Sequence, residues 1–379
     1  RYFLASRGLG DVYKRQKQHV VQVVPELSVR VSPGLSAVPL EGPARTLDVR
    51  AFVQHNAAGA GEAAVRLQVP DGWSVEPAEV PLDFAYEGEE AAARFRVTPP
   101  DSPTPGAAAL RVVAARGERE YRDNVQAVAY DHTQRRQRLL PAEVRVLVLD
   151  VRTSPDARVG YVMGSGDGVA EGIRQLGVPL TLLTAEDLAF GDLSRFTTIV
   201  TGIRSYETRG DLRSVHPRLM AWVEGGGHLV VQYNRAPFNR VSPHRTRGGS
   251  SGETSPFAPY PAVTSRDRIT DETAPLDVLA PDHPLLTTPN RIGAADWEGW
   301  VQERGTYFLD ARDPRYVELL SGSDPVPNNP GEKKGILVDA EVGEGTWTYV
   351  GLVLFRQIPA GVPGGWRLLA NLVSRPRGD

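Results

Sequence analysis

The chain has 379 residues, a length that predicts two or three domains. Its apolar share of 41% and charged share of 23% are ordinary for a globular protein, and a net charge of −3 gives no electrostatic case for nucleic acid or an anionic membrane as a partner. Cysteine is absent, which excludes disulfides, thiolate metal sites and cysteine nucleophiles, and no apolar run is long enough to predict a membrane span.

The N-terminal segment differs from the rest of the chain. The chain begins at Arg1, and residues 8–16 read GLGDVYKRQ, which resembles the translated sequencing-adapter tail of many metagenomic gene fragments. We therefore expect residues 1–16 to be an artefact and coding sequence upstream to be missing. The alternative is a genuine N-terminal loop.

Residues 17–130 alternate between apolar and polar side chains with a period of two. Residues 47–53 and 93–97 place their apolar side chains on one face, and turns such as Pro33-Gly34 and Asp71-Gly72 separate such segments. About seven short strands at this spacing predict an immunoglobulin-like β-sandwich. Residues 69–75 (VPDGWSV) resemble a strand turn of the sandwich domains attached to bacterial glycosidases, the α-galactosidase-associated type. We expect Trp73 to pack in the core and not to serve as a ligand platform.

Residues 131–142 carry a basic cluster and a proline, which indicates a solvated linker. From residue 143 to residue 375, strand-like runs alternate with helical ones, the pattern of a parallel sheet with crossover helices. We expect strands at 144–151, 159–163, 179–183, 197–201 and 228–233, and helices at 168–176, 212–224 and 365–373. A loop over residues 235–263 and a hairpin of residues 335–341 and 346–354 complete the prediction.

This second half resembles the flavodoxin-like α/β fold of class I glutamine amidotransferases, in its degenerate branch. It is also similar to the C-terminal region of large bacterial PIG-L (LmbE-like) deacetylases, through residues 159–167, 202–209, 229–234, 282–285, 300–305 and 355–361. In that family a zinc deacetylase domain precedes a sandwich and then this module. The resemblance therefore implies an enzyme whose catalytic domain and zinc lie upstream.

No catalytic residue, metal ligand or cofactor is predicted within the chain itself. The deacetylase signature, Pro-His-Pro-Asp-Asp with a later His-x-x-His, does not occur, and no two of the seven histidines have metal-ligand spacing on one element. In active amidotransferases a cysteine follows a central strand and a histidine follows a late strand. The equivalent positions here fall near Tyr233 and Asn234 and near Phe355 to Gln357, and neither offers a nucleophile with a base.

Binding remains possible at the carboxyl ends of the parallel strands, where open α/β sheets hold their ligands. Four segments are expected to converge there, and their arginines, amides and free backbone N–H groups suit an anion or sugar hydroxyls. The other interpretation, that these residues brace one another, remains open. The candidate ligand-binding residues are Gly164, Ser165, Gly166, Asp167, Arg204, Tyr206, Arg209, Gln232, Tyr233, Asn234, Arg356 and Gln357.

Two further motifs have structural interpretations. We expect His283, in Asp282-His283-Pro284, to cap or hydrogen-bond locally and not to act as a catalyst. Asp296, Trp297 and Trp300 could form a sugar platform, but aromatic residues at that spacing are more often core or loop anchors.

Three functions follow from these observations. The leading hypothesis is a non-catalytic accessory region of a PIG-L-type N-acetyl-sugar deacetylase, structural or carbohydrate-orienting. The alternatives are a stand-alone module that binds a small anion or a sugar, and a hydrolase or transferase with an unrecognised site. Sandwich modules of polysaccharide-related proteins favour export, by analogy alone, and the sequence indicates no oligomeric state.

Overall fold

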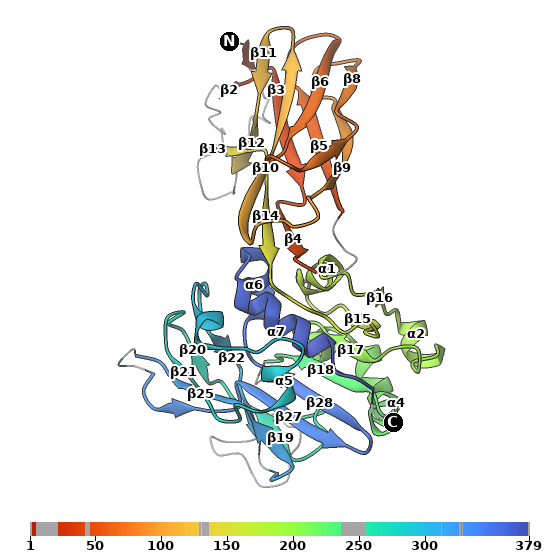
Figure 1. The fold of residues 1–379 in the computed structure, drawn as a ribbon, viewed down its shortest axis with the longest axis vertical. Coiled ribbons are helices and arrows are strands. Elements are labelled where there is room, and N and C mark those ends of the chain that lie inside the picture. Colours follow the sequence, from red (N-terminus) through yellow and green to blue (C-terminus); the bar gives the residue numbers. More distant parts are fainter. Residues whose placement is uncertain are drawn as a thin grey trace, which may run out of the picture. The chain divides into compact units, whose positions relative to one another are not determined.

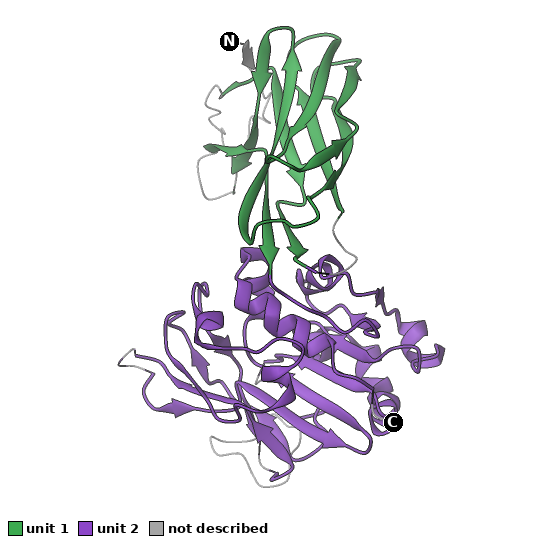
Figure 2. Cartoon of the chain, viewed as in Figure 1, with its two compact units in different colours: residues 1–40, 45–149 green, residues 41–44, 150–379 purple. Residues whose placement is uncertain are grey.

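The computed structural model describes residues 2–4, 22–41, 46–128, 130, 136–235, 255–311, 313–325, 327 and 329–377. Contacts divide the chain into two units, residues 1–40 with 45–149 and residues 41–44 with 150–379 (Figure 2). Most of the predicted loop at 235–263 lies outside the described residues. At the start of the chain, within the predicted artefact, β1 (Tyr2–Leu4) pairs antiparallel with β2 (Gln22–Val24).

The first unit is a β-sandwich (Figure 1), as its period-two alternation predicts. One sheet has the order β3-β5-β9-β7 and the other the order β4-β14-β10-β6-β8, with β11 beside β10. The strands are β3 (Leu27–Ser32), β4 (Leu35–Pro39), β5 (Leu47–His55), β6 (Gly61–Gln68), β7 (Ser74–Glu76), β8 (Glu79–Phe84), β9 (Glu90–Thr98), β10 (Gly106–Arg116), β11 (Arg119–Tyr121) and β14 (Glu143–Leu149).

Alternation of apolar side chains builds the sandwich core. Along β5, Val49, Ala51 and Val53 are fully buried, and the residues between them lie on the outer face. Trp73 is partly buried and packs against this core, which confirms its predicted role. It follows a tight turn in which Gly72 has φ +81°, a value that glycine adopts without strain.

The predicted boundary between the two halves is wrong by one strand. β14 (Glu143–Leu149) pairs antiparallel with β10 and parallel with β4, both strands of the sandwich. Val144, Val146 and Val148 are buried in the sandwich core, so the strand belongs there and not to the α/β sheet. Residues 131–135 of the predicted linker lie outside the described residues. The remainder forms β13 (Arg136–Pro141), which pairs with β12 (Asp123–Val128).

The second unit contains a seven-stranded sheet of order β16-β15-β17-β18-β28-β27-β24. The first five strands run parallel, and β27 and β24 are antiparallel to their neighbours. Their bounds are β15 (Val159–Val162), β16 (Leu180–Leu182), β17 (Thr198–Thr201), β18 (His228–Gln232), β24 (Tyr316–Glu318), β27 (Leu337–Val342) and β28 (Gly345–Val350).

Helices pack beside this sheet in two groups. One group contains α2 (Ala185–Phe190), α3 (Ser205–Thr208) and α4 (Gly210–Glu224), and Leu219 and Val223 of α4 share a buried cluster with Ile199 and Leu229 of the sheet. The other group contains α1 (Val169–Gln175), α6 (Leu354–Ala360) and α7 (Pro363–Val373).

The region between β18 and β27 is more structured than predicted. The described residues of this region form short sheets, an α-helix and a 3₁₀ helix. Its elements are β19 (Ala262–Thr264), β20 (Arg268–Ile269), β21 (Leu276–Val278), α5 (Pro284–Thr287), η2 (Ala294–Trp297), β22 (Gly305–Thr306), β23 (Leu309–Ala311), β25 (Leu320–Ser323) and β26 (Glu332–Lys333). Strands of two to four residues carry too little alternation for sequence reasoning to find them.

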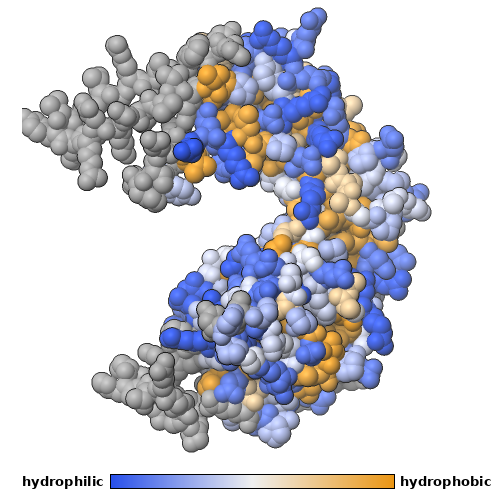
Figure 3. Space-filling model, turned by 90° about the vertical axis from the view of Figure 1, so that its left-hand side faces the viewer, coloured by the Kyte–Doolittle hydropathy of each residue, from blue (hydrophilic) through white to orange (hydrophobic). Residues whose placement is uncertain are grey.

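Within the described residues, no helix combines the length and apolar character that a membrane span requires. On the face drawn in Figure 3, hydrophilic side chains predominate and apolar patches are interspersed among them.

Candidate functional site

The structure brings the four predicted segments together at the carboxyl ends of the parallel strands. The segment after β15 meets the segment after β17, where the N–H of Ser165 donates to the carbonyl of Ile203 at 3.0 Å. The segment after β17 meets the one after β18, where the N–H of Arg204 donates to the carbonyl of Tyr233 at 2.9 Å. Phe355 of α6 reaches the same place through its ring, 5.5 Å from that of Tyr233.

Asp167 ties the first two segments together. Its Oδ1 accepts from the hydroxyl of Tyr161 at 2.6 Å and from the N–H of Val169 at 3.0 Å, and its Oδ2 accepts from the N–H of Ile203 at 3.2 Å. The chain approaches itself closely here, because a Cβ on Gly164 would lie 2.1 Å from the carbonyl oxygen of Ile203. The glycine-rich turn is therefore needed for the close approach of Gly164 to Ile203. The Asp167 carboxylate already accepts from the N–H of Val169, the first residue of α1, so this amide is not free for a ligand.

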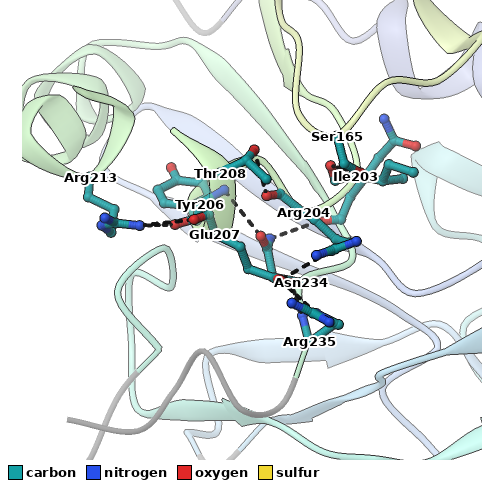
Figure 4. Close-up of polar contacts among 10 residues, drawn as sticks. Ser165, Ile203, Arg204, Tyr206, Glu207, Thr208, Arg213, Asn234 and Arg235 are labelled. Atoms are coloured by element: carbon teal, nitrogen blue, oxygen red, sulfur yellow. Dashed lines mark hydrogen bonds and ion pairs between the residues drawn. The ribbon is translucent and has the colours of Figure 1, made fainter. Parts of the chain in front are cut away.

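Glu207 joins the second and third segments (Figure 4). Its Oε2 lies 3.1 Å from Nε of Arg204 and 2.7 Å from Nε of Arg235, and its side chain is only 8% exposed. The side chain of Asn234, which is fully buried, accepts from the N–H of Tyr206 at 3.2 Å. Arg204 adopts φ +57°, a left-handed conformation that these contacts hold in place.

Gln232 and Tyr161 connect the centre of the edge. Nε2 of Gln232 donates to the Tyr161 hydroxyl at 3.0 Å, and that hydroxyl donates to Asp167. Burial, together with the nearby Asp167 carboxylate, raises the pKa of Tyr161 well above its ordinary value, so the phenol stays protonated. Oε1 of Gln232 is buried and has no hydrogen-bond partner among the described residues.

The predicted position of Arg356 and Gln357 at the end of a late strand is wrong. β28 ends at Val350, and both residues lie in α6, because the apolar run after Val350 turns into a helix. Gln357 is fully buried, where its amide accepts from the N–H of Val301 at 2.9 Å and donates to the Val301 carbonyl at 3.0 Å. Arg356 contacts Gln302 and Glu303.

The remaining candidates are also engaged within the chain. Arg209 forms an ion pair with Asp211 and donates to the carbonyl of Met163 at 3.4 Å. Tyr206 is fully buried with its hydroxyl 3.0 Å from Nδ1 of His216, and Tyr233 stacks on Tyr307. Ser165 and Gly166 are exposed, and the Ser165 hydroxyl donates to the carbonyl of Ile203 at 3.3 Å. Because most of these polar groups make their contacts within the chain, the geometry favours mutual bracing over ligand binding.

The bracing interpretation makes a prediction for Asp167. Replacing it by Asn should lower the free energy of unfolding by about 1–3 kcal/mol, because the Asn amide presents a donor where a backbone N–H or the Tyr161 hydroxyl now donates. Chemical denaturation measures this, with Asp156→Asn, the same change at an exposed aspartate of the same unit, as the control. If Asp167→Asn is as stable as Asp156→Asn, the carboxylate is not a brace and becomes available to a ligand.

His283 has the local role that the sequence predicts. Its side chain caps α5, with Nδ1 accepting from the N–H of Leu285 at 3.3 Å. Its Nε2 lies 3.3 Å from Oδ2 of Asp339, a contact that the sequence did not indicate. No group of three or more metal-ligating side chains occurs in the part of the chain that the structure describes.

Sequence reasoning missed a buried polar network on β18, β27 and β28. Asp339 accepts from the Thr348 hydroxyl at 2.5 Å and from Arg375 at 2.6 Å, and Nε2 of His228 lies 2.8 Å from the Thr348 hydroxyl. The signal was present in the sequence, because Asp339 interrupts the apolar run Leu337-Val338-Asp339-Ala340 of a strand that lies inside the sheet. The role of Asp339 could not be predicted, because its partners are distant from it in the sequence.

These observations define the class of protein: a β-sandwich unit joined to an α/β unit whose carboxyl edge is closed by contacts within the chain. A comparison of the sequence with models of protein families gives a match within the sandwich. Residues 42–116 match the family described as "NPCBM-associated, NEW3 domain of alpha-galactosidase". The matched segment contains β5 to β10, and it confirms the predicted resemblance to the α-galactosidase-associated type. A comparison with curated protein sequences finds no match.

Solved structures are similar at low identity. A β-galactosidase from Rahnella sp. R3 is 15% identical over 58% of this chain and 32% of that chain, with a TM-score of 0.35. The chaperone DraB from E. coli is 12% identical over 34% of this chain and 59% of its own, with a TM-score of 0.21. A FixG-related protein from Vibrio parahaemolyticus is 9% identical over 33% of this chain and 98% of its own, with a TM-score of 0.21. The chain therefore spans less than two thirds of the length of the β-galactosidase and of DraB.

Proposed function

We infer that the chain is a non-catalytic accessory region of a carbohydrate-active protein. The observation that carries this proposal is the closed carboxyl edge, where the side chains of Asp167, Glu207 and Asn234 form hydrogen bonds and ion pairs with neighbouring segments of the chain. The family match of the sandwich supplies the carbohydrate association. By analogy with that association, the parent protein is exported.

The α/β unit is proposed to be a degenerate, flavodoxin-like relative of class I glutamine amidotransferases. Its five parallel strands, numbered along the chain, have the order 2-1-3-4-5, which is the flavodoxin-like order and supports the assignment. In that fold the ligand site lies outside the carboxyl ends of the strands. Here the chain contains no cysteine, and Tyr233 and Asn234 follow β18 at the position where the nucleophile would stand.

The purified chain is expected to release no ammonia from glutamine and no acetate from N-acetylhexosamines, because the hydroxyls that lie beside a possible base at this edge, Tyr161 beside Asp167 and Tyr206 beside His216, are fully buried and out of reach of a substrate. A coupled ammonia assay and an acetate assay measure this, with Arg204→Ala as the companion variant. Turnover that Arg204→Ala abolishes would overturn the accessory assignment and place a reaction at the edge. Turnover that survives in the variant would also contradict it, with the reaction located elsewhere in the chain.

The finer proposal is that the parent protein is a PIG-L-type zinc deacetylase of N-acetylated sugars. It rests on the resemblance of the six segments of the α/β unit and on the order of the two units, sandwich first. Longer sequence reads across the same locus test it directly. A reading frame that encodes a Pro-His-Pro-Asp-Asp segment ahead of residue 17 supports the proposal, and a frame that encodes a different domain there refutes it.

A further inference from the structure

A cavity of about 530 Å³ lies in the α/β unit, away from the carboxyl-edge residues. Its walls come from β21, from η2 and from the segment that follows η2, and its volume is within the range of small-molecule sites. The lining residues that carry the argument are Glu272, Leu276, Trp297, Glu298, Trp300 and Arg304. None of them belongs to the predicted ligand-binding set.

Two tryptophans form a rigid apolar wall of the cavity. The rings of Trp297 and Trp300 are tilted at 46° with their centroids 5.7 Å apart, and Nε1 of Trp300 donates to the carbonyl of Asp296 at 2.9 Å. Both side chains are almost buried, so their positions are fixed before any ligand arrives. Leu276 adds aliphatic surface. The exposed parts of the two rings and Leu276 offer apolar surface against which the C–H groups of a sugar ring can pack.

A buried guanidinium supplies a hydrogen-bond donor to the same cavity. Arg304 is only 5% exposed; its Nε donates to the carbonyl of Ala274 at 2.8 Å, and its Nη1 donates to the carbonyl of Trp297. Nη2 has no acceptor among the residues that the structure describes. This nitrogen is not sealed from solvent, so an oxygen acceptor on a ligand in the cavity can take the place of water there.

Two carboxylates complete the site. Glu272 is partly buried and Glu298 is exposed, and both line the cavity. They accept hydrogen bonds from hydroxyl groups, and they repel a second anion. The cavity therefore combines an apolar wall, a fixed donor and two acceptors, which a ligand with an aliphatic face and several hydroxyl groups would satisfy.

We propose that this cavity binds an uncharged pyranose sugar, with the sugar ring against Trp297 and Trp300, a sugar oxygen on Nη2 of Arg304 and hydroxyl groups on Glu272 and Glu298. The site goes beyond the accessory role proposed above, because it lies in the α/β unit and not in the sandwich that carries the family match. An anionic sugar binds less well, since Glu272 and Glu298 oppose its charge.

The test uses the full chain and a panel of neutral trisaccharides (cellotriose, chitotriose and maltotriose), with triglucuronic acid as the anionic comparison. Isothermal titration calorimetry is expected to show binding of at least one neutral trisaccharide, with a dissociation constant on the order of 1 mM or lower. Triglucuronic acid is expected to bind at least tenfold more weakly. If none of the neutral sugars binds, or if triglucuronic acid binds equally well, the proposal is overturned.

A matched pair of variants locates the binding. Ala294 and Ala295 are adjacent, exposed residues of η2, but only Ala294 lines the cavity. Ala294→Trp is expected to weaken sugar binding at least tenfold by filling the cavity, and Ala295→Trp is expected to leave it unchanged. Equal affinities of the two variants would place the sugar elsewhere and refute the site. The accessory role fails on different results, namely turnover by the chain or an unrelated upstream domain.

Discussion

Replacing Asp339 by Asn is expected to lower the free energy of unfolding of the α/β unit by about 3 kcal/mol or more. The carboxylate is 3% exposed and lies against Thr348, Arg375 and His283. Burial alone would raise the pKa of Asp339, but the hydrogen bond from His283 and the charge of Arg375 outweigh it and hold the pKa below its ordinary value. The buried charge is thus compensated, and Asn leaves Arg375 without its counter-ion.

Urea denaturation followed by tryptophan fluorescence measures this loss, because five of the six tryptophans lie in residues 150–379. Asp156→Asn, the same change at an exposed aspartate of the same unit, is the matched control and should leave the midpoint where it is. Equal midpoints for the two variants would mean that the Asp339 network contributes nothing to stability.

Acidification from pH 7 to pH 5 is expected to cost the α/β unit about 4 kcal/mol of stability, because the fold holds two histidines neutral. Burial lowers the pKa of His216 from 6.5 to about 4, and burial together with the charge of Arg375 lowers the pKa of His228 to about 3. Below pH 6.5 the unfolded chain takes up protons that the folded chain refuses, so stability falls as pH falls. Each histidine contributes about 1.4 kcal/mol per pH unit until its folded pKa is reached.

The dependence can be assigned to one residue. His216→Gln removes a titrating group and keeps an acceptor for the Tyr206 hydroxyl, which lies 3.0 Å from His216 Nδ1. We expect this variant to lose only about 2 kcal/mol over the same pH interval, because His228 alone remains. Urea midpoints at pH 7 and pH 5 give the comparison. An unchanged pH dependence in His216→Gln would show that His216 is accessible to protons in the folded state.

Local pattern was sufficient to predict much of the fold. The alternation along β5 and the helix of residues 212–224, observed as α4, follow directly from apolar spacing. The boundary failed at β14, because Val144, Val146 and Val148 could face either core equally well and only pairing with β10 and β4 decides between them. α2 was missed although Thr184 and Asp187 form a capping box, because six residues are too few to show a helical period.

At the carboxyl edge, the order of strands predicts which segments approach one another but not what their side chains do. Arg204 was expected to be available to an anion, but Glu207 pairs with both Arg204 and Arg235 and holds them within the chain. The cavity lined by Trp297 and Trp300 could not be predicted from the sequence for a related reason. Trp297 and Trp300 were expected to be core or loop anchors. The role of Arg304 depends on its hydrogen bonds to the carbonyls of Ala274 and Trp297, which leave one guanidinium nitrogen without a partner among the described residues.

β14 also has a mechanical consequence. It pairs along one side with β10 and along the other with β4, and Asp150 follows it directly. A force that pulls on the chain at Asp150 acts along the strand and loads these two rows of hydrogen bonds in shear, where they share the load, and not one at a time as in peeling. The sandwich therefore resists extension at the point where the chain leaves it, because tension on the polypeptide there is shared by the hydrogen bonds of two neighbouring strands.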